Sequence, residues 1–306
     1  MTQNCPTRTL LAETLQQELP LRQATHPHLD CEVTFRYGGF VGSVIECHAE
    51  LPRAMDHARS HIARIEGESG SVPNGMVILA DTMSRSKGRF TRSWHAPAGG
   101  VWGCLVHANT LLDLSKRFVP LAVGVACCEA VHAVGGDKAT LRWVNDVLFG
   151  EKKVAGFLVE GFSGPRYSDE YHMVGFGINV NNRTFPEELS GSATSLVHEL
   201  GREFDLTRFT TLFLAKLAWN FGLLYYEEAT YLENGSYSGQ DGMHQLLANW
   251  RNLSDTIGQR VVFGFDVMTS PQYEATVIGV DPDGGLRLRF DDGAVVVEHS
   301  GEIRYR

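Results

Sequence analysis

Four polar side chains stand in or beside an otherwise apolar segment at residues 141–160. They are Arg142, Asn145, Asp146 and Lys153. Burying such groups without partners is costly, so they require either one another or a ligand. The segment therefore predicts either a structural ion-pair network or a site where a cation and a carboxylate face a polar ligand.

A second group of polar residues lies in the predicted loop 81–103. Its cations are Arg85, Lys87, Arg89 and Arg92, and they alternate with small and hydroxyl side chains. Exposed backbone N–H groups together with cations form a clamp for polyphosphates. A solvated basic loop is the alternative, but a cationic loop in a chain of net charge −9 favours the phosphate clamp. We expect this loop to close over a ligand and exclude water.

Two histidines, His57 and His61, stand four residues apart on the predicted helix 51–65. This spacing suits either a pair of metal ligands or a solvated helix face. Because no HExxH pattern and no nearby cysteine completes a metal site, we favour the solvated face.

The composition excludes several classes of protein. With 43% hydrophobic and 21% charged residues, the 306-residue chain can fold into one large and one small globular domain. Its net charge of −9 disfavours a general nucleic-acid binder. We expect neither a secretory signal nor a membrane span, since the apolar segment 118–134 is interrupted by Glu129 and His132. Six cysteines without CxxC spacing indicate reduced thiols and a cytoplasmic location.

Strands and helices in mixed order must position these residues. The apolar patterns predict strands at 42–47, 75–80, 101–107, 141–149, 154–159 and 172–180, a turn at Gly150 and Glu151, helices at 10–19, 51–65, 118–134, 194–200 and 207–232, and an irregular segment at 20–31. Alternation along strand 141–149 places Arg142 and Asp146 on one face. In strand 172–180, Gly175 and Gly177 indicate that another backbone or a flat ligand passes close.

The C-terminal part of the chain changes character. After the loop 234–242, segments 259–265, 273–280, 286–290 and 294–298 alternate between apolar and polar residues in strand fashion. Turn signals rich in Asp and Gly separate them. Four or five short strands in about 55 residues predict a small β-barrel of SH3-like size.

Taken together, these segments resemble the biotin protein ligases, in the wider biotin/lipoate ligase superfamily. Residues 142–146 (RWVND) are similar to the family's KWPND strand, and 152–160 (KKVAGFLVE) to its K-(L/I)-(A/G)-G-I-L-x-E continuation. Residues 87–97 resemble its GRGRxGRxW…SP loop. Residues 177–181 (GINVN) match its GIxxN-type strand, and 300–303 (SGEI) its SGE(I/V) signature.

The resemblance implies an α+β fold: a mixed central β-sheet with flanking helices, as in class II aminoacyl-tRNA synthetases and biotin ligases, plus a small C-terminal SH3-like β-barrel. It places an N-terminal extension at 1–41, a ligase catalytic domain at 42–245 and a C-terminal domain at 246–306. The extension is too short for a complete winged-helix DNA-binding domain, so we expect no nucleic-acid partner and no repressor role. We also expect no membrane partner, and a homodimer is compatible with the resemblance.

The implied reaction uses ATP and Mg²⁺. A carboxylic acid attacks the α-phosphate of ATP to give an acyl-AMP and pyrophosphate, and a lysine of an acceptor carrier protein then takes the acyl group. Such chemistry depends mostly on positioning and on neutralising charge.

The resemblance also implies roles for individual residues. Lys153 stabilises the ligand carboxylate and the α-phosphate, and Arg89 clamps phosphates from the loop. Asp146 binds Mg²⁺ or polar ligand groups, or orients the incoming lysine. Further contacts of the substrate or nucleotide are implied for Lys87, Gly88, Arg92, Trp94, Gly99, Gly100, Arg142, Asn145, Gly156 and Asn179.

The sequence departs from the family where the acid would be recognised. The family's biotin-reading Ser-Thr-Asn, expected after the first strand, falls on residues 47–49 and thus on Cys47 and His48. A family glutamine falls on Met83. An apolar pocket suits lipoate or octanoate, whereas no RRxSGGG-like segment of lipoate ligases is found. We favour biotin, with a lipoate or octanoate ligase, or a non-catalytic ligand-binding relative, as alternatives.

Overall fold

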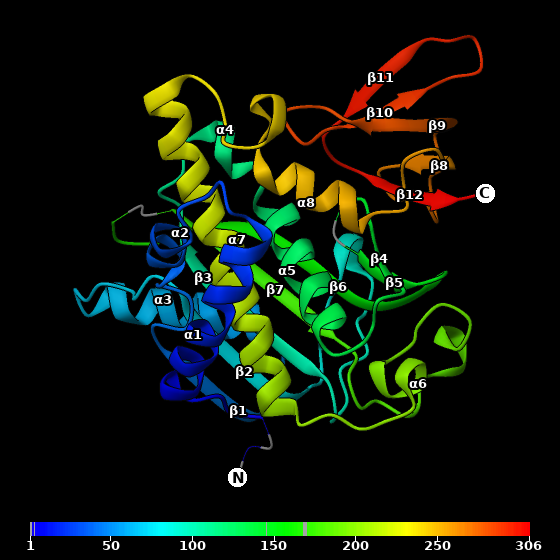
Figure 1. The fold of residues 1–306 in the computed structure, drawn as a ribbon. Coiled ribbons are helices and arrows are strands. Elements are labelled where there is room, and N and C mark those ends of the chain that lie inside the picture. The colour runs from blue at the N-terminus through cyan, green and yellow to red at the C-terminus, as the bar shows by residue number, and fades with distance from the viewer. Residues whose placement is uncertain (1, 3, 145, 168–169) are drawn as a thin grey trace.

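The structure is a computed structural model that describes residues 2, 4–144, 146–167 and 170–306. Its helices are α1 (Arg8–Thr25), α2 (Cys31–Gly38), α3 (Ala54–Gly67), α4 (Asp113–Lys116), α5 (Val119–Ala133), α6 (Leu196–Leu200), α7 (Leu206–Asn234) and α8 (Gln245–Leu253). Its strands are β1 (Ile45–Leu51), β2 (Met76–Met83), β3 (Val101–Ala108), β4 (Ala139–Arg142), β5 (Asp146–Phe149), β6 (Lys152–Ser163), β7 (Glu170–Ile178), β8 (Arg260–Gly264), β9 (Tyr273–Val280), β10 (Leu286–Arg289), β11 (Val295–Glu298) and β12 (Glu302–Tyr305). Figure 1 shows their arrangement around a central sheet.

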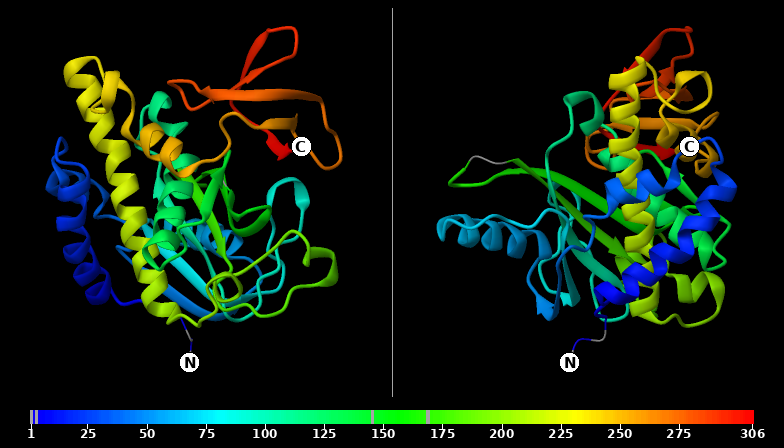
Figure 2. Two further views of the ribbon diagram at one scale, coloured as in Figure 1. Left: turned by 45° about the vertical axis from the view of Figure 1, so that its right-hand side comes forward. Right: turned by 60° about the vertical axis from the view of Figure 1, so that its left-hand side comes forward.

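The central sheet has seven strands in the order β1-β2-β3-β7-β6-β5-β4. β1 pairs parallel to β2, and the other neighbours pair antiparallel, so the sheet is mixed as predicted. Helix α3 covers one face, and α1, α2, α5 and α7 lie on the other (Figure 2). The mixed α+β fold expected from the sequence is thereby confirmed.

The sequences of the long helices α5 and α7 explain why α5 is buried and where α7 begins and ends. α5 is apolar on nearly all sides, which is typical of a buried helix, and Pro120 lies in its first turn, where a missing N–H costs nothing. The Asp205 carboxylate accepts the N–H of Arg208 and thereby starts α7. Gly235, with a φ of 72°, ends that helix in the left-handed conformation.

The prediction of an irregular segment at 20–31 is wrong for the first part of that range, because α1 continues through Pro20 to Thr25. A proline inside a helix costs about 3 kcal/mol by local criteria. Tertiary contacts offset this cost: the Arg22 guanidinium donates to both carboxylate oxygens of Glu129 on α5, at 2.7 and 2.6 Å. The helix is therefore held by a partner far away in the sequence.

The N-terminal helices are packed into the same layer as α7. Gly38 on α2 and Gly222 on α7 let the two backbones touch, since a Cβ at Gly38 would lie 1.8 Å from the carbonyl oxygen of Ala218. A Cβ at Gly222 would lie 2.1 Å from the carbonyl oxygen of Thr34. Helices α1 and α2 thus contribute a helical layer to the core of the large sheet.

The single strand predicted at 141–149 is wrong. The chain reverses within it, and β4 and β5 pair antiparallel with Arg142 opposite Asp146. Directly opposed residues share a face of the sheet, so these two side chains still lie on one side as expected. The predicted turn before β6 is confirmed, with Gly150 at a φ of 58°.

The C-terminal strands form a separate antiparallel sheet in the order β11-β10-β9-β8-β12. All four predicted strands are present, and β12, which contains part of the SGEI segment, pairs with β8. Figure 1 shows this sheet above the central one, with α8 between them. Within the described part of the chain, each helix is too short or too polar to span a bilayer.

A disulfide joins Cys5 to Cys47 of β1, so the prediction of reduced thiols is wrong for this pair. The N-terminal segment runs beside the edge strand and brings the two Cα atoms within 5.6 Å. The prediction of a cytoplasmic location rested on reduced thiols and loses that support. The remaining cysteines are free and buried: Cys31, Cys104, Cys127 and Cys128. Burial raises the pKa of the Cys104 thiol to about 12, which keeps it protonated and inert.

We expect the Cys5→Ser variant to lose about 2–4 kcal/mol of unfolding free energy, because the bond closes a long loop in the unfolded chain. Cys5 and Cys47 are 42 residues apart in sequence. Urea unfolding with and without a reductant measures the effect. Reductant should lower the midpoint of the wild type and leave that of Cys5→Ser unchanged. An equal shift in both would show that this bond does not support the fold.

Candidate active site

One cavity of about 640 Å³ lies where the central sheet, the loop 84–96 and the C-terminal sheet meet. Figure 2 shows this loop, in cyan, rising from the sheet toward β12. The structure brings together eleven of the residues predicted from the sequence in its lining: Met83, Lys87, Gly88, Arg89, Arg92, Trp94, Arg142, Asp146, Lys153, Gly156 and Asn179.

Lys153 and Asp146 form an ion pair in this cavity, with Nζ 2.7 Å from Oδ2. Both side chains are partly exposed, at 33% and 24%, so solvent screens the pair and it contributes little stability. The backbone of Lys153 is fixed, since its N–H donates to the carbonyl of Ser192 and its own carbonyl accepts the N–H of Thr194. The ammonium group can therefore exchange Asp146 for an anionic ligand without moving the strand.

The side chains of two loop arginines form hydrogen bonds with the C-terminal domain. Arg89 donates to the carbonyl oxygen of Gly301 at 2.7 Å, and Arg92 donates to Glu302 at 2.6 Å and to Asp266. Burial lowers the pKa of Arg89, and the nearby charges of Glu302 and Asp146 oppose that shift. The loop thus closes one side of the cavity and holds desolvated positive charge near the Lys153–Asp146 pair.

The indole of Trp94 packs closely against two glycines of the sheet. A Cβ at Gly177 would lie 2.6 Å from Trp94 Nε1, and one at Gly156 would lie 3.1 Å from the ring. The expectation of a close approach at Gly177 holds, but the approaching group is this side chain and not the backbone or flat ligand that was predicted. Gly175 is approached instead by the sulfur of Met55, which would lie 2.6 Å from a Cβ there. Among the described groups, the buried Nε1–H of Trp94 has no acceptor, which leaves it for a ligand.

Arg142 and Asn179 line the cavity in different ways. The Arg142 guanidinium lies 4.3 Å above the ring centre of Tyr305, which connects β4 to β12. Asn179 is 3% exposed, and its N–H donates to the carbonyl of Val154. Arg142 therefore ties the two sheets together beside the Lys153–Asp146 pair.

The end of the cavity beneath α3 contains a residue that the sequence analysis missed. Arg53 donates to Asp56 and Glu160, each at 3.1 Å, and to the sulfur of Met55 at 3.3 Å. It was missed because the first strand was predicted to end at residue 47, whereas β1 ends at Leu51. The residues that follow the strand are thus 52 and 53, which precede α3, and the proline at position 52 was the available signal.

Five predicted site residues are not placed with the others. Cys47 is bound in the disulfide, and His48 packs toward α3, so neither of these described residues lines the cavity. Gly99 and Gly100 are likewise absent from its described lining; a Cβ at Gly100 would lie 2.0 Å from the ring of the nearby Trp102. Asn145 lies outside the described residues.

Residues 63–181 match the biotin/lipoate A/B protein ligase family. The biotin--[acetyl-CoA-carboxylase] ligase of Paracoccus denitrificans is 30% identical over 232 residues, which are 72% of this chain and 86% of that protein. The bifunctional ligase/repressor BirA of Bacillus spizizenii is 31% identical over 140 residues, or 45% of this chain. The chain spans only 43% of the length of that relative.

The structure of the biotin protein ligase from Aquifex aeolicus in complex with biotin and ATP has the same fold. The two superpose with a TM-score of 0.66 at 22% identity, over 86% of this chain and 98% of that one. The match of residues 63–181, and a relative 30% identical over most of its length, show where the chain belongs. It is a member of the biotin/lipoate A/B protein ligase family.

Proposed function

We propose that this protein is an ATP-dependent ligase that forms biotinyl-AMP and transfers the biotinyl group to a lysine of an acceptor carrier protein. The observation that carries the proposal is that one cavity is lined by Lys153 and by two loop arginines, Arg89 and Arg92, which are hydrogen-bonded to the C-terminal domain. Biotin is favoured because the Paracoccus relative is named a biotin ligase and the Aquifex structure holds biotin and ATP.

In the first step, a carboxylate oxygen of biotin attacks the α-phosphorus of ATP, and the bond to the pyrophosphate oxygen breaks. Negative charge gathers on the phosphate oxygens during this displacement. Lys153 leaves Asp146 and neutralises the carboxylate and the α-phosphate as they approach. Arg89 and Lys87 add positive charge from the loop, where exclusion of water strengthens each interaction.

Mg²⁺ is part of this proposal, and the residues present fit it. Mg²⁺ is usually held by one or two carboxylates together with substrate phosphates. Asp146 supplies one such carboxylate in the cavity, and it becomes available when Lys153 turns to the substrate. When bound there, the ion would neutralise charge on the leaving pyrophosphate.

In the second step, the neutral amine of the acceptor lysine attacks the acyl carbon, and the bond from that carbon to the AMP oxygen breaks. Asp146, released from Lys153, accepts a hydrogen bond from the incoming amine and orients it. The closed loop keeps water from the acyl-AMP until the acceptor arrives.

The residues that line the cavity beneath α3 bear on which carboxylic acid the protein binds. Met55, Met83 and Leu158 make this end largely apolar, which favours lipoate or octanoate as a second candidate. Arg53 is the polar group there, and its guanidinium can donate to a ureido oxygen. We place biotin first because this donor belongs to a preorganised network.

Exchange of labelled pyrophosphate into ATP tests the proposal, measured with biotin, with lipoate, with octanoate and without an acid. We expect exchange that depends on biotin. Exchange with lipoate or octanoate alone would reassign the acid. Biotin binding by calorimetry without exchange would make the chain a non-catalytic relative, and exchange with none of the acids would end the ligase proposal.

A further inference from the structure

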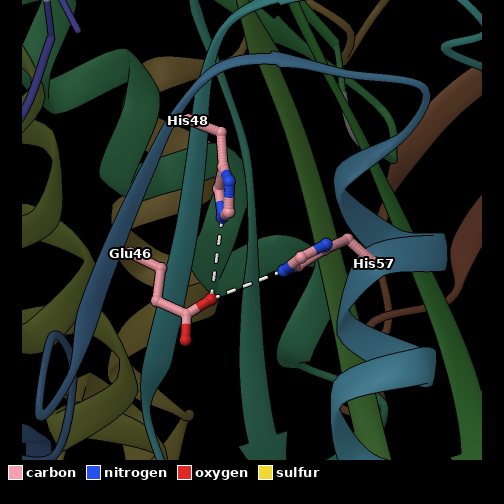
Figure 3. Close-up of side chains that lie close together, drawn as sticks. All are labelled: Glu46, His48 and His57. Carbon is pink, nitrogen blue, oxygen red and sulfur yellow. Dashed lines mark ion pairs between the residues drawn. The ribbon is translucent and has the colours of Figure 1, made fainter. Parts of the chain in front are cut away.

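Outside the cavity, the edge strand β1 and helix α3 bring three possible metal ligands together: Glu46, His48 and His57 (Figure 3). Glu46 and His48 alternate along β1, so both point to the face that α3 covers. The sequence analysis favoured a solvated helix face for His57 because no further ligand was near in sequence. The missing ligands come from the neighbouring strand.

The two distances from Glu46 to the histidines are close to those in a tetrahedral metal site. Glu46 Oε2 lies 3.4 Å from His57 Nε2 and 3.7 Å from His48 Nε2, and one ligand atom from each residue lies within 4.8 Å of the others. Bonds of about 2.0–2.1 Å in tetrahedral geometry separate ligand atoms by about 3.3–3.4 Å. The two distances to Glu46 are thus close to the tetrahedral values, and the two histidine nitrogens, which lie within 4.8 Å of each other, would close around a central ion by side-chain rotation.

Hydrogen bonding does not account for the arrangement. The two distances to Glu46 exceed normal hydrogen-bond lengths. His48 Nε2 is shielded from solvent and has no hydrogen-bond partner among the described groups. Buried polar atoms in native proteins almost always have a partner, and a cation bound between this nitrogen and the carboxylate would supply one. This orphaned atom is the second, independent indication of a ligand.

The surroundings hold the three groups in place. His61 Nδ1 lies 3.6 Å from the other carboxylate oxygen of Glu46 and restricts its rotation. The rings of His48 and His57 pack edge to face, with centres 4.6 Å apart. Cys47, between the two β1 ligands, is fixed by its disulfide to Cys5. The exposed fractions of the three ligands, 30–32%, leave one side open to water.

We propose that Glu46, His48 and His57 bind Zn²⁺ or a similar divalent transition-metal ion, with water at the fourth position. Two imidazole nitrogens and one carboxylate oxygen favour such ions over Mg²⁺ and Ca²⁺, which prefer all-oxygen sites. The bound ion links the edge strand β1 to helix α3. This site is separate from the Asp146 carboxylate and does not depend on the proposed ligase activity.

Equilibrium dialysis of the full chain, without a histidine tag and stripped with a chelator, tests the site by metal analysis. We expect about one Zn²⁺ per chain, not displaced by millimolar Mg²⁺. Removing a residue that only supports a metal ligand costs about 10- to 100-fold in affinity, so losing a ligand itself should cost at least about 100-fold. We expect that loss in His57→Gln and in Glu46→Gln, and a loss of about tenfold in His61→Gln.

The double variant His198→Gln/His299→Gln is the matched control, because both of these histidines are exposed and distant in sequence. It should bind Zn²⁺ like the wild type. Visible absorption of bound Co²⁺ gives a second readout, which His57→Gln and Glu46→Gln should abolish. Absence of stoichiometric binding, or an equal loss of affinity in the control, would overturn the proposal.

Discussion

Replacement of Lys153 by alanine lowers biotin-dependent adenylate formation by about 10²- to 10³-fold, the usual cost of losing one preorganised charge-stabilising group. The ammonium group faces the cavity and has Asp146 as its partner, at 2.7 Å. Its removal takes away positive charge where phosphate charge develops and leaves the Asp146 carboxylate uncompensated. Pyrophosphate exchange at saturating ATP measures the effect.

Lys152→Ala is the matched control, because this neighbouring lysine is exposed and does not belong to the described lining of the cavity. Its exchange rate should stay within about twofold of the wild type, since surface substitutions change little. The double variant Lys153→Ala/Asp146→Asn separates lost attraction from added repulsion, and we expect it to remain far below the wild type. Activity of Lys153→Ala within a few-fold of the wild type would refute the central role of this residue.

Replacement of Arg89 by glycine releases the acyl-adenylate to solvent. The guanidinium donates to Gly301 across the cavity mouth, and a hydrogen bond to a charged group contributes about 1.5–3 kcal/mol. Losing it should raise the escape of biotinyl-AMP by about 10- to 100-fold. Free adenylate acylates exposed lysines, so biotinylation of an unrelated bystander protein measures the escape.

Arg85→Gly makes the same chemical change in the same loop at an exposed position. Its bystander labelling should equal that of the wild type. If Arg89→Gly labels the bystander no more than Arg85→Gly does, then the link between the loop and the C-terminal sheet does not retain the intermediate.

Local sequence patterns were sufficient where a motif lies within one segment. The residues of the loop 84–96 and of the β5–β6 hairpin were found because residues that are close in sequence within each segment also lie close together in the cavity. The glycine alternation in β7 correctly indicated a close approach, but the approaching groups are the side chains of Trp94 and Met55 and not a backbone or a ligand. The strands of the C-terminal sheet followed from alternation and turn residues.

The errors concern features that are decided by distant contacts. The end of β1 depends on its pairing with β2, which carries the strand to Leu51 and makes Arg53, not His48, the residue at the cavity. α1 passes through Pro20 because of an ion pair to α5. The bond from Cys5 to β1 likewise reflects proximity in space, which cysteine spacing cannot reveal.

The most direct test of the proposed mechanism measures the transfer of labelled oxygen from biotin to AMP. Biotin labelled with ¹⁸O in both carboxylate oxygens is incubated with the protein, ATP and an acceptor carrier domain, and the AMP is analysed by mass spectrometry. Attack of the carboxylate on the α-phosphorus, followed by cleavage of the acyl carbon–oxygen bond by the lysine, predicts one ¹⁸O atom in each AMP. AMP without ¹⁸O, or ¹⁸O in pyrophosphate or phosphate, would contradict the mechanism.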